Sequence, residues 1–423
     1  MKLLSPSDFL KNTLILLLGT GLGQAIPILL QPVLRRVYSP EEFGAFAIYF
    51  SLFIILTVFT NFRYDLAIGL PASDKESANL LFITTGLNLL FNIFILIVIL
   101  LFKNDIVSHL AFPVDLGNLL FILPASMFFY SFCQSVNYWL IRKKAFRSIS
   151  VNKVARRGAE GIIQVGFGFF RNPAGLFWGD LAGNIFNSMI GVLQLKKTGF
   201  SLSGYSTGSI KELLKRYSHF PKYNLLPHLL GTIGMQYPVF IINRLYTKTD
   251  LGQFDLTQQA LVFPFALITV SVSQVLMKKV TDDRNEKKPV LRDFLHVTAV
   301  LGVIGILSLV IIVLFGPVLF SFVFGSEWHL AGIYSRILIF GYIFYLVASP
   351  MNAVLISLEK VKTLGIWNVF HFLLMIGLGF IRDIPFPTFL KFFAFFQIIS
   401  FTLFYLLTFN EVRKHDAGLK YLP

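Results

Sequence analysis

The chain reads RVYSPEEFGAF from Arg36 to Phe46 and RLYTKTDLGQF from Arg244 to Phe254. The two stretches align without a gap, and they are separated by about half of the 423 residues. Arg, Tyr, Gly and the final Phe are identical at corresponding positions, and the seventh position is acidic in both. Each stretch follows a long apolar run, so the pattern indicates two related halves. Chance is the alternative, because loops that end helices often contain Gly and an aromatic residue.

The composition excludes several classes of protein. Hydrophobic residues make up 55% of the chain and charged residues only 14%, whereas a soluble protein has about 25% charged residues. A soluble enzyme, a DNA-binding domain and a disordered chain are therefore excluded. The single cysteine, Cys133, leaves no disulfide framework and no cysteine-based metal site.

Long apolar runs recur along the whole chain. A helix needs about 20 apolar residues to cross a bilayer, and barrel strands would alternate every second residue instead. The sequence predicts an all-α integral membrane protein with about twelve transmembrane helices. The predicted spans are 12–34, 44–62, 78–102, 117–140, 151–170, 174–195, 223–243, 256–277, 295–322, 333–357, 362–381 and 388–409.

The basic residues indicate how the spans are oriented. The chain has 37 Lys and Arg against 22 Asp and Glu, and most of the basic residues fall in loops on one side of the predicted spans. The positive-inside rule assigns that side, and with it both ends of the chain, to the cytoplasm. The basic excess therefore indicates membrane topology, and no nucleic-acid partner is predicted.

A polar segment divides the chain in the middle. Gly, Ser and Thr are frequent there, and Lys211 to Arg216 is suited to a short surface helix. We predict an N-terminal lobe at 1–197, a cytoplasmic linker at 198–220 and a C-terminal lobe at 221–423. Six spans in each half give the halves the same orientation, so a pseudo-twofold axis along the membrane normal relates them, as in some secondary transporters.

Polar side chains recur at helical spacing inside several spans. In 151–170 they are Asn152, Arg156, Glu160 and Gln164, each four residues after the last, so they share one helix face. Because polar groups are costly in lipid, such faces predict a hydrated cavity. Alternatives stay open: amides can bond between packed helices, and Arg156 and Glu160 can neutralise each other. Similarly, Arg63 can belong to the positive-inside bias, Arg244 can reach the membrane surface, and Asp180 can bond locally.

No pattern for a chemical reaction is present. The chain has no phosphate-binding Gly-rich loop and no Gly-x-Ser-x-Gly nucleophile turn. Its seven His are scattered without metal-ligand spacing. We therefore predict that the protein is not an enzyme and uses no cofactor and no metal. Pro27 can bend the first helix and is a candidate gating residue.

The N-terminal region resembles a known family of membrane proteins. The runs GTGLGQAIP at Gly19–Pro27, RRVYSPEEFG at Arg35–Gly44 and RYDLAI at Arg63–Ile68 resemble O-antigen and capsular polysaccharide flippases. These belong to the multidrug/oligosaccharidyl-lipid/polysaccharide (MOP) exporter superfamily. The resemblance implies a MATE-like bundle of two lobes. It also implies alternating-access transfer of undecaprenyl-diphosphate-linked oligosaccharide to the outer leaflet of the bacterial cytoplasmic membrane.

The resemblance and the polar helix faces together give candidate roles to individual residues, and the roles of Arg156 and Arg157 rest on the polar face alone. Family members bind the diphosphate with cationic residues, a role for which the guanidinium fork of Arg is suited. Proton or sodium ions are the expected coupling ions, and a polysaccharide polymerase is an expected partner. The diphosphate candidates are Arg63, Arg156, Arg157 and Arg244; the sugar candidates are Gln24, Gln31, Asn184 and Gln236; the coupling and gating candidates are Asp65, Glu160, Asp180 and Pro27.

Two rival functions remain. A multidrug/cation antiporter of the same superfamily would have an acidic, aromatic cavity, and the arginines speak against it. A membrane polysaccharide polymerase or glycosyltransferase should have a sizeable loop with paired carboxylates or arginines, and the predicted loops are short.

Overall fold

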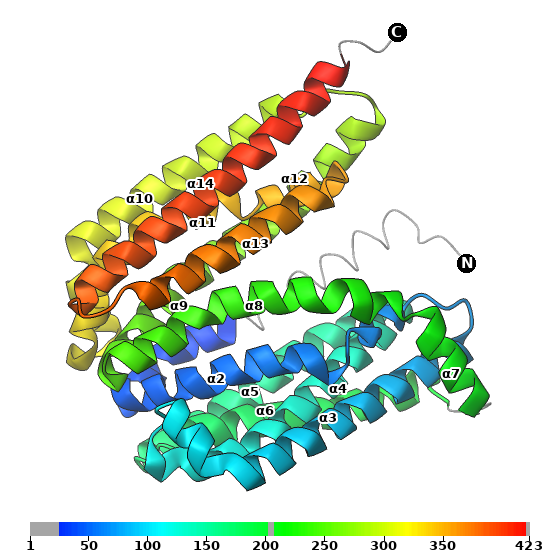
Figure 1. Ribbon diagram of the computed structural model, residues 1–423, viewed down its shortest axis with the longest axis horizontal. Coiled ribbons are helices and arrows are strands. Elements are labelled where there is room, and N and C mark those ends of the chain that lie inside the picture. The colour runs from blue at the N-terminus through cyan, green and yellow to red at the C-terminus, as the bar shows by residue number, and fades with distance from the viewer. Residues whose placement is uncertain (1–24, 202–206, 420–423) are drawn as a thin grey trace. The chain divides into compact units, whose positions relative to one another are not determined.

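A computed structural model describes residues 25–201 and 207–419 of the chain (Figure 1). Every regular element in these two ranges is a helix, which confirms the predicted all-α fold. The chain forms two compact units, Met1–Thr232 and Ile233–Pro423, here called unit 1 and unit 2. The boundary falls after the predicted linker, and the division at 198–220 stays a prediction.

Unit 1 begins, in the described residues, with a helical segment at 25–37. Its further elements are α2 (Pro40–Thr60), η1 (Tyr64–Ala67), α3 (Asp74–His109), η2 (Val114–Phe121), α4 (Ile122–Arg142), α5 (Phe146–Phe169), α6 (Gly175–Lys197) and α7 (Thr207–Arg216). α8 (His219–Leu245) begins in unit 1 and ends in unit 2.

Unit 2 repeats the pattern of long helices joined by short turns. Its remaining elements are α9 (Lys248–Asn285), α10 (Leu291–Phe324), η3 (Ser326–Trp328), α11 (His329–Ala348), α12 (Met351–Ser357), α13 (Val361–Gly377), η4 (Leu378–Phe380) and α14 (Phe386–Leu419).

The helices coincide with the predicted spans. Nine of those in the described ranges are long and apolar enough to cross a membrane. α5 and α6 are not among the nine, because their charged and polar residues reduce their hydropathy, but at 24 and 23 residues they are long enough. The first predicted span, 12–34, lies largely outside the described residues. Side chains such as Val303, Leu307 and Val310 on α10 are exposed, as expected of a surface in lipid. The chain is therefore a multi-pass membrane protein.

The two repeated stretches have the same local structure. Ser39 caps α2 and Thr247 caps α9, each by accepting a hydrogen bond from a backbone N–H of the first turn. The acidic residue of the repeat, Glu42 or Asp250, bonds back to the backbone N–H of the cap residue. Such reciprocal capping boxes fix the start of a helix. α2 and α9, which contain the second part of each repeat, thus begin with the same capping box.

Small residues bring α5 and α6 close together. Gly179 and Gly183 lie one helical turn apart on α6, facing α5. A Cβ atom on Gly179 would lie 2.3 Å from Cγ of Gln164, and one on Gly183 would lie 2.8 Å from the backbone oxygen of Arg156. Close approach at small residues is typical of helix packing in membranes. α5 therefore places its polar face directly against α6.

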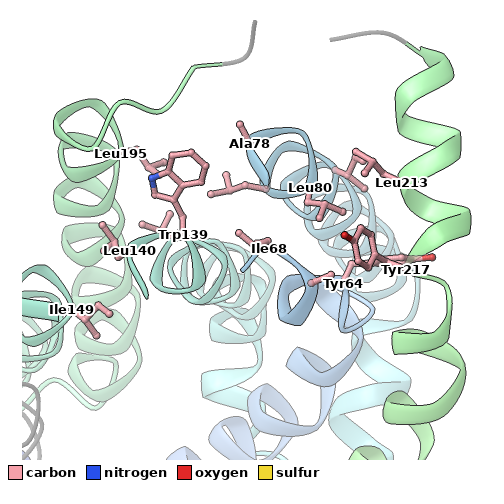
Figure 2. Close-up of a cluster of buried hydrophobic side chains, with 14 residues drawn as sticks. Tyr64, Ile68, Ala78, Leu80, Trp139, Leu140, Ile149, Leu195, Leu213 and Tyr217 are labelled. Carbon is pink, nitrogen blue, oxygen red and sulfur yellow. The ribbon is translucent and has the colours of Figure 1, made fainter. Parts of the chain in front are cut away.

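The predicted linker helix is present as α7 and packs on unit 1. Leu213 and Tyr217 belong to a buried cluster that includes Tyr64, Leu80 and Trp139 (Figure 2). The Tyr64 hydroxyl donates a hydrogen bond of 3.1 Å to the backbone oxygen of Leu214. The helix that follows residues 202–206 is thus anchored to the core of unit 1.

Candidate functional site

A buried carboxylate lies where four helices of unit 1 meet. Asp180 of α6 has a fully buried side chain, and an oxygen of its carboxylate lies 3.6 Å from a terminal nitrogen of Arg156 on α5. Ser126 of α4 donates to Asp180 at 2.5 Å and Tyr49 of α2 donates at 3.3 Å. Asn184 donates to Asp180 at 3.3 Å and to Ser126 at 2.8 Å. Asp180 therefore joins all four helices.

A second ion pair lies on α5. The Arg157 guanidinium lies 2.8 Å from the Glu160 carboxylate, three residues further along the helix. The alternative of a pair between Arg156 and Glu160 is therefore replaced by two pairs with different partners. Two cations and two anions give a neutral network, as expected for charged groups at membrane depth.

The four charged side chains are not equally accessible. The Asp180 side chain is 0% exposed and that of Arg157 is 32% exposed, whereas Glu160 and Arg156 are nearly equally buried, at 11% and 14%. Asp180 is therefore sealed inside unit 1, and Arg157 is the most accessible member of the network. In addition, Nε of Arg156 is buried without a hydrogen-bond partner in the described part of the chain. The Arg157 guanidinium is thus the charged group of the network that is most open to an anion.

A row of polar side chains extends from Arg156 along α4. The Arg156 guanidinium carbon lies 4.9 Å from the ring centre of Tyr130, a cation–π distance. Gln134 donates to the Tyr130 hydroxyl at 3.1 Å, Asn137 donates to Gln134 at 3.4 Å, and Asn152 of α5 donates to Asn137 at 3.5 Å. The sequence analysis missed the three α4 residues, although their spacing of four and three was visible.

Arg63 lies at a turn between α2 and η1. Its φ of 62° is in the left-handed region, and its half-buried side chain has a buried Nε without a partner in the described ranges. Asp65 is buried nearby, and burial raises the pKa of its carboxyl above the ordinary value although Arg63 opposes the shift. Arg63 is also close enough to Tyr138 and His228 for electrostatic interaction.

The other predicted residues lie apart from this network. Gln31 is half-buried and accepts a hydrogen bond of 2.8 Å from Arg35. Pro27 is half-buried in the helical segment 25–37, and Gln24 lies outside the described residues. Gln236 and Arg244 are on the part of α8 that belongs to unit 2, where Gln236 is half-buried and Arg244 exposed. The described residues contain no group of three His, Cys, Asp or Glu that could hold a metal ion.

Polar contacts also join helices in unit 2 near the start of α9. Gln253 of α9 donates to the backbone oxygen of Glu327 at 2.6 Å and accepts from the backbone nitrogen of Ala331 at 2.9 Å. Thr257 donates to the backbone oxygen of Ala331 at 2.9 Å. These contacts join α9 to η3 and α11.

The fold is shared with known membrane transporters. An inward-facing multidrug resistance MATE family transporter of the MOP superfamily matches with a TM-score of 0.72 and 15% identity, over 94% of this chain and 95% of that chain. The lipid II flippase MurJ in an inward closed conformation matches with a TM-score of 0.70 and 15% identity, over 96% and 91%. A MOP superfamily transporter from Pyrococcus furiosus, described as having a binding pocket of reverse polarity, matches with a TM-score of 0.62 and 16% identity, over 97% of each chain.

These similarities define the fold class as that of MOP superfamily membrane transporters. A family model described as "Polysaccharide biosynthesis protein" matches residues 33–333, and the chain belongs to this family. No curated protein sequence matches the chain. The resemblance inferred from the N-terminal motifs is thereby confirmed at the level of family and fold.

Proposed function

We propose that the protein transfers undecaprenyl-diphosphate-linked oligosaccharide units from the cytoplasmic to the outer leaflet of the bacterial cytoplasmic membrane by alternating access, for O-antigen or capsule synthesis. The observation that carries the proposal is the arginine pair of unit 1. Arg156 and Arg157 are paired with the buried carboxylates of Asp180 and Glu160, and the Arg157 side chain stays 32% exposed. The family match adds the link to polysaccharide synthesis.

The substrate needs such a site for its polar part only. Its lipid tail stays in the bilayer, whereas each sugar hydroxyl stripped of water costs about 1–3 kcal/mol. A hydrated, polar path removes most of this cost. Arginine suits the diphosphate because its planar fork donates two hydrogen bonds to adjacent oxygens. Arg63 and Arg244 are proposed as further diphosphate contacts, and Gln24, Gln31 and Gln236 as sugar contacts.

Asn184 is better suited to position Asp180 than to contact sugar. Its amide already donates to Ser126 and to Asp180 inside unit 1. Binding a sugar hydroxyl through the same N–H groups would require at least one of these bonds to break.

The energy for transfer has two proposed sources. An inside-negative potential favours outward movement of an anion by about 2.3 kcal/mol per charge per 100 mV, so a diphosphate with about two charges gains about 4–5 kcal/mol. Re-entry of protons or sodium ions is the second source. Glu160 and Asp180 are the proposed coupling residues, because neutralising either carboxylate would release its arginine for the substrate. Asp65 is a further candidate, and Pro27 a candidate hinge.

The topology of the proposal rests on the positive-inside rule. Both ends of the chain are assigned to the cytoplasm, and the turn that contains Arg63 then lies at the cytoplasmic face. Arg63 is therefore placed where the diphosphate of a newly made lipid enters. A polysaccharide polymerase is the proposed partner that receives the transferred unit.

The direct test uses the purified full chain in liposomes. The substrate is a polyprenyl-diphosphate oligosaccharide with a fluorescent sugar, and a membrane-impermeant quencher reports which leaflet contains it. We expect faster transfer than in protein-free liposomes, and a loss of transfer for Arg156→Gln and Arg157→Gln. Transfer no faster than in protein-free liposomes would refute the proposal. Unchanged transfer in Glu160→Gln and Asp180→Asn variants would remove the coupling role of these two residues.

A cation antiporter is the second candidate, because a MATE multidrug transporter has the same fold. The same liposomes test it with a cationic dye. Proton-driven dye uptake together with an immobile oligosaccharide lipid would favour the antiporter.

A further inference from the structure

Four polar side chains of unit 1 form one connected row, here called the amide ladder: Tyr130, Gln134 and Asn137 of α4 and Asn152 of α5. The three α4 residues are four and three positions apart, so they share one helix face. Hydrogen bonds of 3.1, 3.4 and 3.5 Å join them in the order Tyr130, Gln134, Asn137, Asn152. The three α4 side chains are only half-buried, so the α4 part of the row is accessible.

The ladder has unused hydrogen-bonding capacity. A side-chain amide has two N–H donors and an oxygen with two lone pairs. Gln134 and Asn137 each use one donor and one lone pair within the ladder, which leaves one of each. Asn152 is 2% exposed, and its Oδ1 has no hydrogen-bond partner in the described part of the chain. This oxygen can therefore accept a hydrogen bond from a ligand or a water.

An arginine lies near each end of the ladder. Arg156 stacks on Tyr130 at one end. At the other end Tyr138, the residue after Asn137, lies within electrostatic range of Arg63. Tyr138 lies eight positions after Tyr130 on the helix, which corresponds to about 12 Å at 1.5 Å per residue. The row is therefore long enough for more than one sugar ring between two cationic groups.

The chemistry of the ladder matches a sugar chain. Sugar rings present hydroxyl groups, which both donate and accept, and an apolar C–H face that packs on an aromatic ring. The ladder offers paired amide donors and acceptors and the ring of Tyr130, and none of its four members carries a charge. Such a surface distinguishes sugars by the positions of their hydroxyl groups, since an unpaired buried amide is unfavourable.

We propose that the amide ladder binds the first sugar rings of the lipid-linked head group and contributes to the choice of glycan. In this arrangement the diphosphate lies at the Arg156 and Arg157 end, where two guanidinium groups are within reach, and the sugar chain extends along α4 toward Arg63. The inference rests on the proposed function and deepens it, because it assigns sugar contacts to residues outside the candidates taken from the sequence.

The test compares two lipids on the same full-length protein in detergent micelles. One is polyprenyl diphosphate without sugar, and the other contains the oligosaccharide. We expect Gln134→Leu and Asn137→Leu to weaken binding of the oligosaccharide lipid about 3- to 10-fold, the effect of losing one or two hydrogen bonds. Binding of the sugar-free lipid should change less than about 2-fold. Tyr130→Phe retains the ring and should have a smaller effect on the oligosaccharide lipid.

A matched control separates sugar contact from helix packing. Gln397 is a half-buried glutamine on α14 of unit 2, and Gln397→Leu should leave both affinities unchanged. Equal loss for both lipids in the ladder variants would mean that the ladder only packs helices, which overturns the inference. The inference also fails if wild-type protein binds both lipids equally, whereas wild-type protein that binds neither lipid contradicts the proposed function itself.

Discussion

The contact between Arg156 and Asp180 gives the sharpest test of the charged network. Replacing Asp180 by Asn removes the negative charge and retains the shape, and replacing Arg156 by Gln removes the positive charge. Each single change leaves one charge of the pair without its partner, and the double change removes both. A double-mutant cycle therefore measures how strongly the two charges are coupled.

The distances set the expected size of the effects. At 3.6 Å the attraction between two unit charges is about 4–5 kcal/mol for an effective dielectric constant of about 20. Removing one partner of a buried pair costs about 3–5 kcal/mol. Arg156→Gln should cost more than Asp180→Asn, because the sealed carboxylate cannot reach water and the partly exposed guanidinium can. The double variant should lose about 1–3 kcal/mol less than the sum of the singles.

The only cysteine of the chain makes the measurement specific to unit 1. Cys133 is buried on α4, with its Sγ 3.2 Å from the Ser188 hydroxyl, so a thiol-reactive dye labels it only when this region opens. Labelling is followed across an SDS titration of purified protein in mild detergent. The exposed pair between Glu76 and Arg216 provides the control, and Glu76→Gln should leave the labelling curve unchanged.

A double variant that loses as much stability as the two single variants together would refute the reasoning, because the two charges would then not stabilise each other in the folded protein. A larger loss for Asp180→Asn than for Arg156→Gln would contradict the burial argument separately. Either result would also weaken the proposal that the carboxylates hold the arginines in place for an anionic substrate.

Three further predictions concern packing, capping and pH. Gly179→Ala should destabilise unit 1 by about 1–3 kcal/mol, because its Cβ would lie 2.9 Å from a backbone oxygen of α5. The control is Gly166→Ala, where nothing lies within 4 Å and the change should be neutral or stabilising. Cys133 labelling in an SDS titration compares the two variants. Ser39→Ala and Thr247→Ala should each cost about 1 kcal/mol through loss of a helix cap, measured by SDS titration followed by tryptophan fluorescence; no loss in either would mean that the capping boxes are not needed. Burial raises the pKa of the Asp65 carboxyl above its ordinary value of 3.8, so the folded protein binds this proton more tightly than the unfolded chain does. The protonated carboxyl therefore stabilises the folded protein at low pH, and this stabilisation is lost as the pH rises through the pKa of the folded state. Asp65→Asn should remove this loss of stability with rising pH. Parallel curves of unfolding free energy against pH for the two proteins would contradict the prediction.

The positions of the helices could be predicted because bilayer thickness sets both their length and their apolar composition. The runs 78–102 and 295–322 became α3 and α10 with longer ends. The two helix starts at Ser39 and Thr247 are also readable from the sequence, since a capping box depends on residues only three apart. Both features depend on residues close together in the chain, so they do not require knowledge of how the helices pack.

The partner of Arg156 could not be predicted in the same way. Spacing along one helix favoured Glu160, but Gly179 and Gly183 on α6 present no side chain to α5 and bring Asp180 within reach of the guanidinium. The residues on α4 were missed for a related reason. Tyr130, Gln134 and Asn137 lie in a stretch of the sequence that also contains Ser131 and Ser135, so their row does not stand out there. Only the packing of α5 on α4 shows that the row continues to Asn152.

The tight fit of α5 against α6 has a consequence for how the protein is made. Each charged residue at the centre of a lone helix raises the free energy of membrane insertion by about 2.5–3.5 kcal/mol, and α5 contains Lys153, Arg156, Arg157 and Glu160. The matching carboxylate and the glycines that allow close contact are on α6, which follows after a short turn. We expect the two helices to leave the translocon together as a preassembled hairpin, so a ribosome that stalls between them should leave α5 outside the bilayer.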